Sequence, residues 1–265
     1  MKRFLFFLFL SVITLGVHSQ APSKKCPTCG QSMAKCHYKG RHPKPSPQKP
    51  VQPTGPTKPT TPSKPAVSKP SSGILNGHEW VDLGLSVKWA TCNVGANSPS
   101  EYGDHYAWGE IIAKSNYEWS NYFDSQDGTD NSWGTATYKH GGQTRITPSS
   151  GRDTARENWG GTWRMPTYTE IKELCKKCKW TWTSHEGHNG YKVTGPNGNS
   201  IFLPAAGWGD GTSKVCVGER GCYLSSTLSS EFNVSAYNIW FTSTRFIASN
   251  DGYRFQGRSV RPVTK

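Results

Sequence analysis

Residues 153–174 read DTARENWGGTWRMPTYTEIKEL, and this stretch decides the fold of the chain. Its first part predicts a short helix over Thr154–Trp159, followed by a Gly-Gly turn. Pro166 then favours entry into a second helix, because its ring fixes a φ angle suited to the first helical turn. Thr167 can cap this second helix, and Glu170, three residues later, completes a capping box. Two short helices joined by a tight turn are therefore expected.

Arg164 lies between the two predicted helices. A guanidinium group can donate two parallel hydrogen bonds to one carboxylate. Asp153 and Glu170 both offer such a carboxylate, and the sequence does not choose between them. In either case we predict that Arg164 has a structural role and locks the two helices together.

The charge of the chain is concentrated at its N-terminal end. Residues 1–73 hold 12 Lys and Arg and no Asp or Glu, whereas residues 74–265 hold 19 Lys and Arg against 18 Asp and Glu. A nucleic-acid groove needs basic residues clustered within the folded part, and the sequence shows no such cluster. We therefore expect no nucleic-acid partner.

The first 19 residues are typical of a signal peptide. Lys2 and Arg3 precede an apolar run over residues 4–16, and Ser19 ends a plausible cleavage site. The run is too short to span a bilayer comfortably, and no later apolar stretch approaches about 20 residues. We expect an exported protein that is secreted, periplasmic or on the cell surface, without a transmembrane segment after cleavage.

Residues 20–42 form a small Cys/His cluster. Cys26, Cys29, Cys36 and His42 have the spacing C-x2-C-x6-C-x5-H, which suits a tetrahedral, structural Zn²⁺ site. His37 is an alternative fourth ligand. Disulfide or redox use of the thiols, or no structure at all, are the other interpretations, since exported cysteines usually pair.

Residues 43–73 are rich in Pro, Lys, Thr and Ser, and they predict a disordered linker of extended, polyproline-like chain. It serves as a solvated spacer or as a contact for acidic polysaccharide. Residues 74–265 carry all eleven Trp and predict one loop-rich domain. Asn197-Gly198 marks a tight hairpin. The strands are expected around 80–90, 190–194, 200–203, 223–226, 238–242 and 257–261.

Further motifs along this domain extend the pattern. In order, residues 79–96 read EWVDLGLSVKWATCNVGA, residues 102–110 read YGDHYAWGE, residues 199–207 read NSIFLPAAG, residues 223–227 read YLSST, and residues 257–263 read GRSVRPV. Together with residues 153–174 they resemble the Fibrobacter succinogenes major paralogous domain, a family of secreted proteins. The resemblance covers roughly residues 78 to 263. It implies an α+β, C-type-lectin-like fold related to the formylglycine-generating-enzyme branch.

Five cysteines lie in this domain. Cys92 and Cys178 fall within the stretches that carry the resemblance, which favours a bond between them. Cys216 and Cys222 flank a short loop that a second bond can close. Cys175 is then left free, or forms an intermolecular link.

No known catalytic arrangement is found. The cysteine chemistry of formylglycine-generating enzymes lies late in the domain, and this chain has no Cys after Cys222. His185 and His188 lie in a glycine-containing turn that predicts a solvated hairpin loop rather than a metal site. Residues 124–131 are acidic enough to suggest Ca²⁺, but they lack the closing Glu of a calcium loop. We therefore expect no enzymatic activity.

The resemblance also indicates where a ligand would bind, because C-type-lectin-like folds carry function on late loops. Aromatic and polar side chains there suit stacking on a sugar and bidentate polar contacts. The candidate ligand-binding residues are Trp208, Asp210, Arg245, Asn250, Asp251 and Tyr253. The alternative is that Trp208 belongs to the core and the others are ordinary loop residues.

The expected function is an exported, non-catalytic binding or adhesion module for an extracellular glycan or protein. The alternatives are a structural envelope protein anchored through its N-terminal Cys cluster, or an enzyme of unrecognised chemistry. A convergent pocket with several ionisable groups would favour the enzyme, and an exposed aromatic surface on the late loops would favour the binding module.

Overall fold

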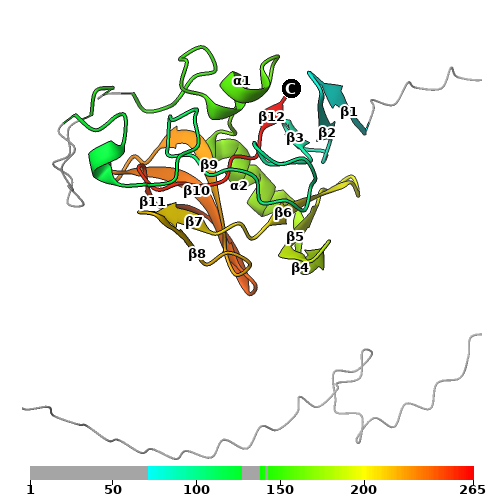
Figure 1. Ribbon diagram of the computed structural model, residues 1–265. Helices are drawn as coiled ribbons and strands as arrows, with labels where there is room; N and C mark the ends of the chain where they lie inside the picture. The colour runs from blue at the N-terminus through cyan, green and yellow to red at the C-terminus, as the bar shows by residue number, and fades with distance from the viewer. Residues whose placement is uncertain (1–70, 127–137, 141–142) are drawn as a thin grey trace, which may run out of the picture. The chain divides into compact units, whose positions relative to one another are not determined.

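The computed structural model describes residues 71–126, 138–140 and 143–265, apart from the side chains of Asn250 and Asp251 (Figure 1). The predicted signal peptide (1–19), the Cys/His cluster with its zinc ligands (20–42) and all but the end of the linker (43–73) lie outside these residues. The described part is α+β and rich in strands, with small antiparallel sheets and few helices. None of its helices has the length and apolar character needed to cross a membrane.

Both predicted helices are confirmed. Helix α1 spans Thr154–Trp159 and helix α2 spans Tyr168–Lys177. A short 3-10 helix, η2, spans Trp119–Asn121. The capping box before α2 is present: the Thr167 hydroxyl accepts from the Glu170 amide at 3.3 Å, and the Glu170 carboxylate accepts from the Thr167 amide at 2.8 Å. These contacts satisfy amide groups that a helix start leaves without partners.

The strands of the described residues form four antiparallel sheets. The first contains β1 (Ser72–Leu75), β2 (His78–Val81), β3 (Lys88–Ala90) and β12 (Val263–Thr264). The second contains β4 (Lys179–His185), β5 (His188–Thr194) and β6 (Ser200–Pro204). The third contains β9 (Gly221–Leu228), β10 (Ser235–Thr242) and β11 (Arg245–Tyr253). The fourth pairs β7 (Trp208–Asp210) with β8 (Ser213–Val215).

Two predicted hairpin turns are confirmed. Asn197-Gly198 lies in the turn between β5 and β6, and Gly198 has a φ of 89°. Glu186 and Gly187 form the exposed two-residue turn of the β4–β5 hairpin, with φ angles of 48° and 82°. Positive φ at both central residues matches the twist of the flanking strands.

Two predicted strands differ from the structure. The strand expected over residues 80–90 is divided into β2 and β3, because Asp82 accepts a hydrogen bond from the Gly84 amide at 2.7 Å and turns the chain. The strand expected over residues 257–261 is replaced by single bridges from Gly257, Arg258 and Ser259 to three different segments. A segment whose neighbours change at each residue cannot form a regular ladder.

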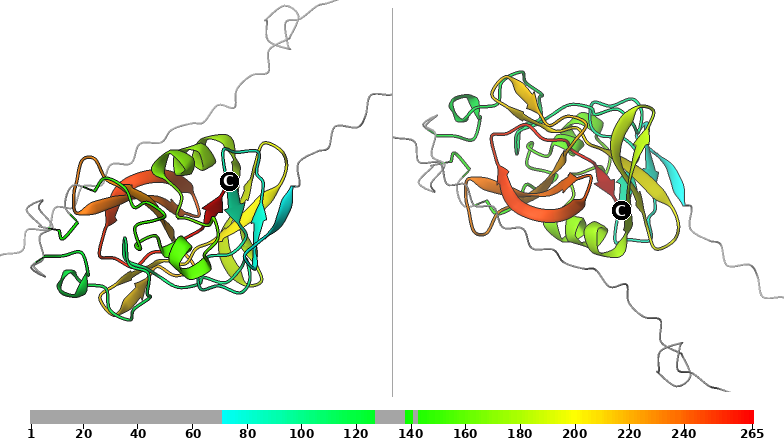
Figure 2. Two further views of the ribbon diagram at one scale, coloured as in Figure 1. Left: turned by 90° about the horizontal axis from the view of Figure 1, so that it is seen from above. Right: turned by 90° about the horizontal axis from the view of Figure 1, so that it is seen from below.

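Buried side chains hold these elements together in three clusters. The largest lies between α2 and the sheets β4–β6 and β9–β11, and Figure 2 shows α2 beside the latter sheet. The second is built around Trp108 and Trp163, and the third around Tyr117 and Trp119. The indole of Trp163 donates to the Leu75 carbonyl at 2.9 Å, which ties the start of the domain to the segment between the helices.

The five cysteines of the domain are free thiols, so the predicted Cys92–Cys178 and Cys216–Cys222 bonds are not formed in the structure. Cys92 packs against the Trp108 cluster, whereas Cys178 packs against the α2 cluster, which places them in different parts of the interior. Burial raises the pKa of Cys175 to about 12 and that of Cys178 to about 11. Both are therefore protonated and unreactive near neutral pH.

Candidate functional site

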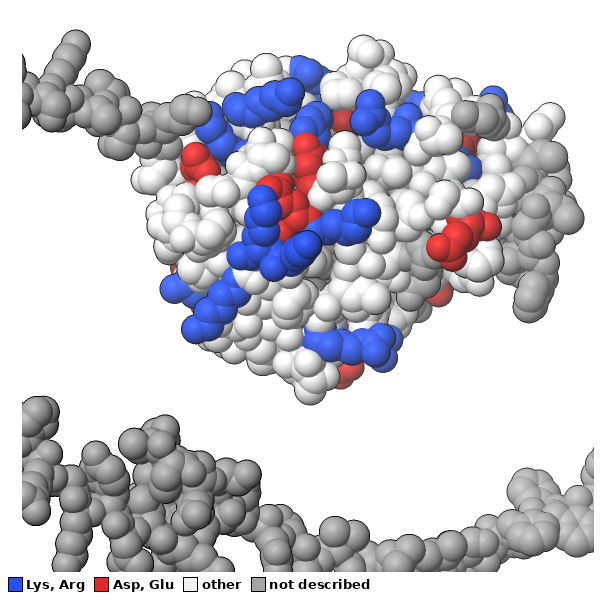
Figure 3. Space-filling view, turned by 180° about the vertical axis from the view of Figure 1, so that it is seen from behind, with Lys and Arg blue, Asp and Glu red and all other residues white. Residues whose placement is uncertain are grey.

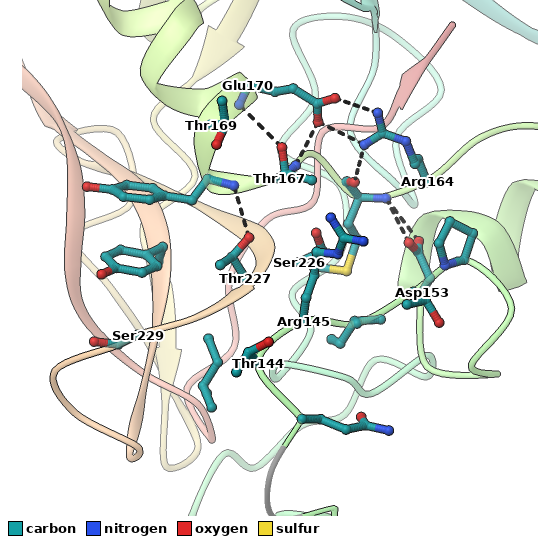
Figure 4. A pocket seen from close by; sticks show the side chains of 18 of the residues that line it. Thr144, Arg145, Asp153, Arg164, Thr167, Thr169, Glu170, Ser226, Thr227 and Ser229 are labelled. Atoms are coloured by element: carbon teal, nitrogen blue, oxygen red, sulfur yellow. Dashed lines mark hydrogen bonds and ion pairs between the residues drawn. The ribbon is translucent and has the colours of Figure 1, made fainter.

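A large open cavity of about 1030 Å³ lies beside the start of α2 (Figure 4). Most of its lining comes from three parts of the chain: residues 143–148, residues 164–170, and residues 226–230 with Tyr237 of β10. Asp153 and Lys265 complete it. We call this cavity the hydroxyl groove. Its volume lies at the upper end of the range of small-molecule sites in proteins.

Backbone pairing fixes the floor of the groove. The Ile146 amide donates to the Ser226 carbonyl at 2.8 Å, and the Leu228 amide donates to the Thr144 carbonyl at 2.9 Å. The Ser226 amide also donates to the Pro166 carbonyl at 2.8 Å. The backbone groups of β9 that make these contacts are therefore already satisfied.

Hydroxyl groups dominate the lining. Hydroxyl-bearing residues come from all three walls: Thr144, Thr147, Thr167, Tyr168, Thr169, Ser226, Thr227, Ser229, Ser230 and Tyr237. Each hydroxyl can donate one hydrogen bond and accept others. Tyr168 and Tyr237 also stack face to face, with ring centroids 3.7 Å apart and an interplanar angle of 9°. The groove therefore combines flat aromatic surface with many adaptable polar groups.

An ion pair holds one wall in place. Arg164 donates to the two oxygens of Glu170 at 2.8 and 2.5 Å. The predicted ion pair of Arg164 is formed with Glu170 of α2 rather than with Asp153. Buried Asp153 instead accepts from the amides of Met165 and Arg156, both at 3.0 Å.

Replacing Glu170 with Gln is expected to lower the free energy of unfolding at neutral pH by about 1–2 kcal/mol. Burial raises the pKa of Glu170, but hydrogen bonds from Arg164 and Thr167 outweigh it and hold the pKa below its ordinary value. A lowered folded-state pKa gives stability that is present above the unfolded-state pKa and is lost as pH falls through the folded-state value. Thermal unfolding between about pH 7 and 3 measures this loss. The Glu170→Gln variant should lose less stability over this range than the wild type, and equal losses would contradict the assignment.

Arg145 adds a positive charge to the groove. Figure 4 shows its side chain extending into the groove near Ser226. Its backbone pairs with Thr227, and its side chain is exposed. Within the described residues no carboxylate forms an ion pair with this guanidinium, so it remains able to bind a ligand.

The four predicted ligand-binding residues whose side chains are described do not line the hydroxyl groove. Trp208 and Arg245 lie on another face, where Arg220 and Trp240 connect them. Tyr253 lies at the opposite end of β11, with its ring centroid 5.8 Å from that of Phe255. Asp210 accepts from the side chain of Gln256 at 3.0 Å. The structure thus divides these residues, and the side chains of Asn250 and Asp251 are not described.

Asp124, the first residue of the suggested calcium loop, has another role. It is fully buried and forms ion pairs with Arg152 and Arg254, while His140 donates to it through its amide at 3.0 Å. Two guanidinium groups already neutralise this carboxylate, so it does not serve as a Ca²⁺ ligand. Residues 127–131 of the loop lie outside the described residues. In the part of the domain that is described, no three His, Cys, Asp or Glu side chains gather as a metal site.

Sequence reasoning missed the groove, although one signal for it was present. Residues 225–230 read SSTLSS, a run of hydroxyl residues on β9 and just after it. Compared with protein-family models, with curated proteins and with solved structures, the chain matches none of them.

Proposed function

We propose that residues 74–265 form an exported, non-catalytic binding module with a C-type-lectin-like fold, of the Fibrobacter succinogenes major paralogous domain type. The module binds an extracellular glycan in the hydroxyl groove. The observation that carries the proposal is the hydroxyl-rich lining beside the stacked pair Tyr168 and Tyr237. Sugar hydroxyls both donate and accept hydrogen bonds, and sugar rings have apolar faces that pack on aromatic surface.

The charged groups of the groove favour binding over catalysis. An activated Ser or Thr nucleophile needs a base within hydrogen-bond reach. Among the described residues that line the groove there is no His. Its side-chain carboxylates are already engaged: Glu170 pairs with Arg164, and Asp153 accepts from backbone amides. This arrangement supports a rigid recognition surface.

A glycan array probed with the full exported chain, followed by titration calorimetry on the best glycan, tests the proposal. Replacing Tyr237 with Ala is expected to weaken binding at least tenfold, because it removes one ring of the stacked pair. Thr227→Val is a second, nearly isosteric variant that removes a groove hydroxyl, and it should weaken binding severalfold.

Tyr253→Ala provides a matched control, because it removes an equally large aromatic ring outside the groove. It should leave the dissociation constant unchanged. A loss with Tyr253→Ala and none with Tyr237→Ala would place binding on the late loops instead. The absence of saturable binding to any glycan would overturn the proposal.

A further inference from the structure

Four side chains alternate between tryptophan and arginine across neighbouring segments of the chain. The Arg220 guanidinium lies 5.8 Å from the centre of the Trp208 ring and 5.5 Å from that of Trp240. The Arg245 guanidinium lies 4.7 Å from the same Trp240 ring. We call these four residues the Trp–Arg ladder. Sequence analysis singled out its two ends, Trp208 and Arg245, but not the residues that join them.

Strand order explains how the ladder forms. Strand β10, which carries Trp240, lies between β9 and β11. Arg220 directly precedes β9 and Arg245 begins β11, so the two guanidinium groups approach Trp240 from neighbouring strands on its two sides. A bridge between Gly207 and Gly221 sets the Trp208 segment alongside the start of β9.

The ladder occupies the face of this sheet that points away from α2. Successive side chains of a strand point to opposite faces. Phe241 is fully buried in the cluster beneath α2, so its neighbour Trp240 points the other way and is only half-buried. Ile247 pairs directly with Trp240 across the sheet and is 41% exposed. Apolar and cationic groups therefore lie side by side on an accessible surface.

The guanidinium groups of the two ladder arginines are able to bind an anionic ligand. Among the side chains that the structure describes, which exclude that of Asp251, no carboxylate forms an ion pair with Arg220 or Arg245. Stacking on an indole orients a guanidinium group and leaves its in-plane N–H groups available for hydrogen bonds. Such N–H pairs match carboxylate and sulfate oxygens, with which they form short, charge-assisted bonds.

We propose that the Trp–Arg ladder is a second binding surface, distinct from the hydroxyl groove, and that it binds an anionic polysaccharide. Carboxylate or sulfate groups of the polymer accept hydrogen bonds from Arg220 and Arg245. The apolar faces of its sugar rings rest on exposed surface such as Ile247. An extended polymer with repeated acidic groups can contact both guanidinium groups at once. Trp240 already orients these two side chains, so little side-chain conformational entropy is lost on binding.

The rest of the domain offers a comparison surface of different character. Figure 3 shows the face that carries α2, where Lys and Arg side chains surround acidic ones. Beside and on α2, Arg164 and Lys177 are paired with Glu170 and Glu173. Lys176 at the end of α2 and Lys179 just after it are exposed, and neither belongs to the ladder or the groove. They are therefore suitable for a charge-matched control.

Binding of the full exported chain to immobilised polygalacturonate and to heparin tests the proposal and separates carboxylate from sulfate recognition. The double variant Arg220→Gln and Arg245→Gln should weaken binding to the preferred polymer at least tenfold at about 150 mM salt. Trp240→Leu keeps both charges but removes the ring that orients them, and it should weaken binding at least threefold. The control double variant Lys176→Gln and Lys179→Gln should change binding less than twofold.

The remaining outcomes each overturn the proposal. Equal losses in the two double variants would show binding to net charge alone, and no binding to either polymer would exclude the ligand class. Polyglutamate bound as tightly as polygalacturonate would assign the surface to acidic proteins. Tyr237→Ala should leave polymer binding unchanged, so that failure of the groove proposal and failure of the ladder proposal remain distinguishable.

Discussion

Replacing Asp124 with Ala is expected to lower the free energy of unfolding by about 3–5 kcal/mol. The Asp124 carboxylate is fully buried and lies between Arg152 and Arg254, whose side chains are only 7% and 3% exposed. Both guanidinium groups also stack on the ring of Trp108, at 5.5 and 4.6 Å from its centre. Without the carboxylate, two buried positive charges remain uncompensated in a medium of low polarity.

Chemical denaturation of the full chain measures this effect. Asp124→Asn keeps the shape of the side chain and removes its charge, so its loss should lie between that of the wild type and that of Asp124→Ala. Lys177→Ala serves as the control, because it breaks an ion pair whose Lys177 side chain is 54% exposed. Exposed pairs contribute at most about 1 kcal/mol. A loss below 1 kcal/mol in Asp124→Ala would show that the cluster is hydrated rather than buried.

Replacing Arg261 with Met is expected to destabilise the domain by about 3 kcal/mol or more. Its guanidinium group is fully buried and donates to the Asn93 side chain at 2.8 Å, and to the carbonyls of Phe202 at 2.9 Å and Ala90 at 3.1 Å. It also donates to the Thr91 carbonyl. A Met side chain fills much of the same space but leaves these buried acceptors without a donor.

Arg261→Lys separates charge from geometry. An ammonium group carries one compact set of donors and cannot reproduce the planar fork of a guanidinium group, so this variant should also lose stability. Arg145→Met is the matched control, because Arg145 is exposed and should change the free energy of unfolding by less than about 0.5 kcal/mol. If Arg261→Met and Arg145→Met had similar melting temperatures, the buried network would not be a major source of stability.

The sequence predicted those parts of the fold whose causes lie within a few residues of one another. The capping box of Thr167 and Glu170 joins groups three residues apart, and the turn at Asn197-Gly198 depends on the backbone freedom of one glycine. Local rules fix such features wherever they occur, since neither depends on the rest of the chain. The bounds of the helix Thr154–Trp159 were also predicted correctly, because they depend on residues within and next to the helix.

Only the tertiary structure decided which distant groups meet. Asp124 meets an arginine 130 residues away in the chain, which changes it from a suggested calcium ligand into the centre of a buried ion cluster. The sequence of residues 257–261 predicts a strand. In the structure, consecutive residues of this segment form single backbone bridges to three different segments, and no local sequence pattern specifies these partners.

The same holds for the binding surfaces. By itself the sequence determined two short helices, a capping box at the start of the second, the hairpin turns, an α+β domain rich in strands and a chain whose positive charge is concentrated before residue 74. The hydroxyl groove unites three segments of the chain, and the Trp–Arg ladder joins Trp208 and Arg220 to the β10–β11 hairpin. Their positions depend on strand pairing and burial across the whole domain. Backbone N–H and C=O groups need hydrogen-bond partners while apolar side chains are removed from water, and both conditions involve residues that are distant in the sequence.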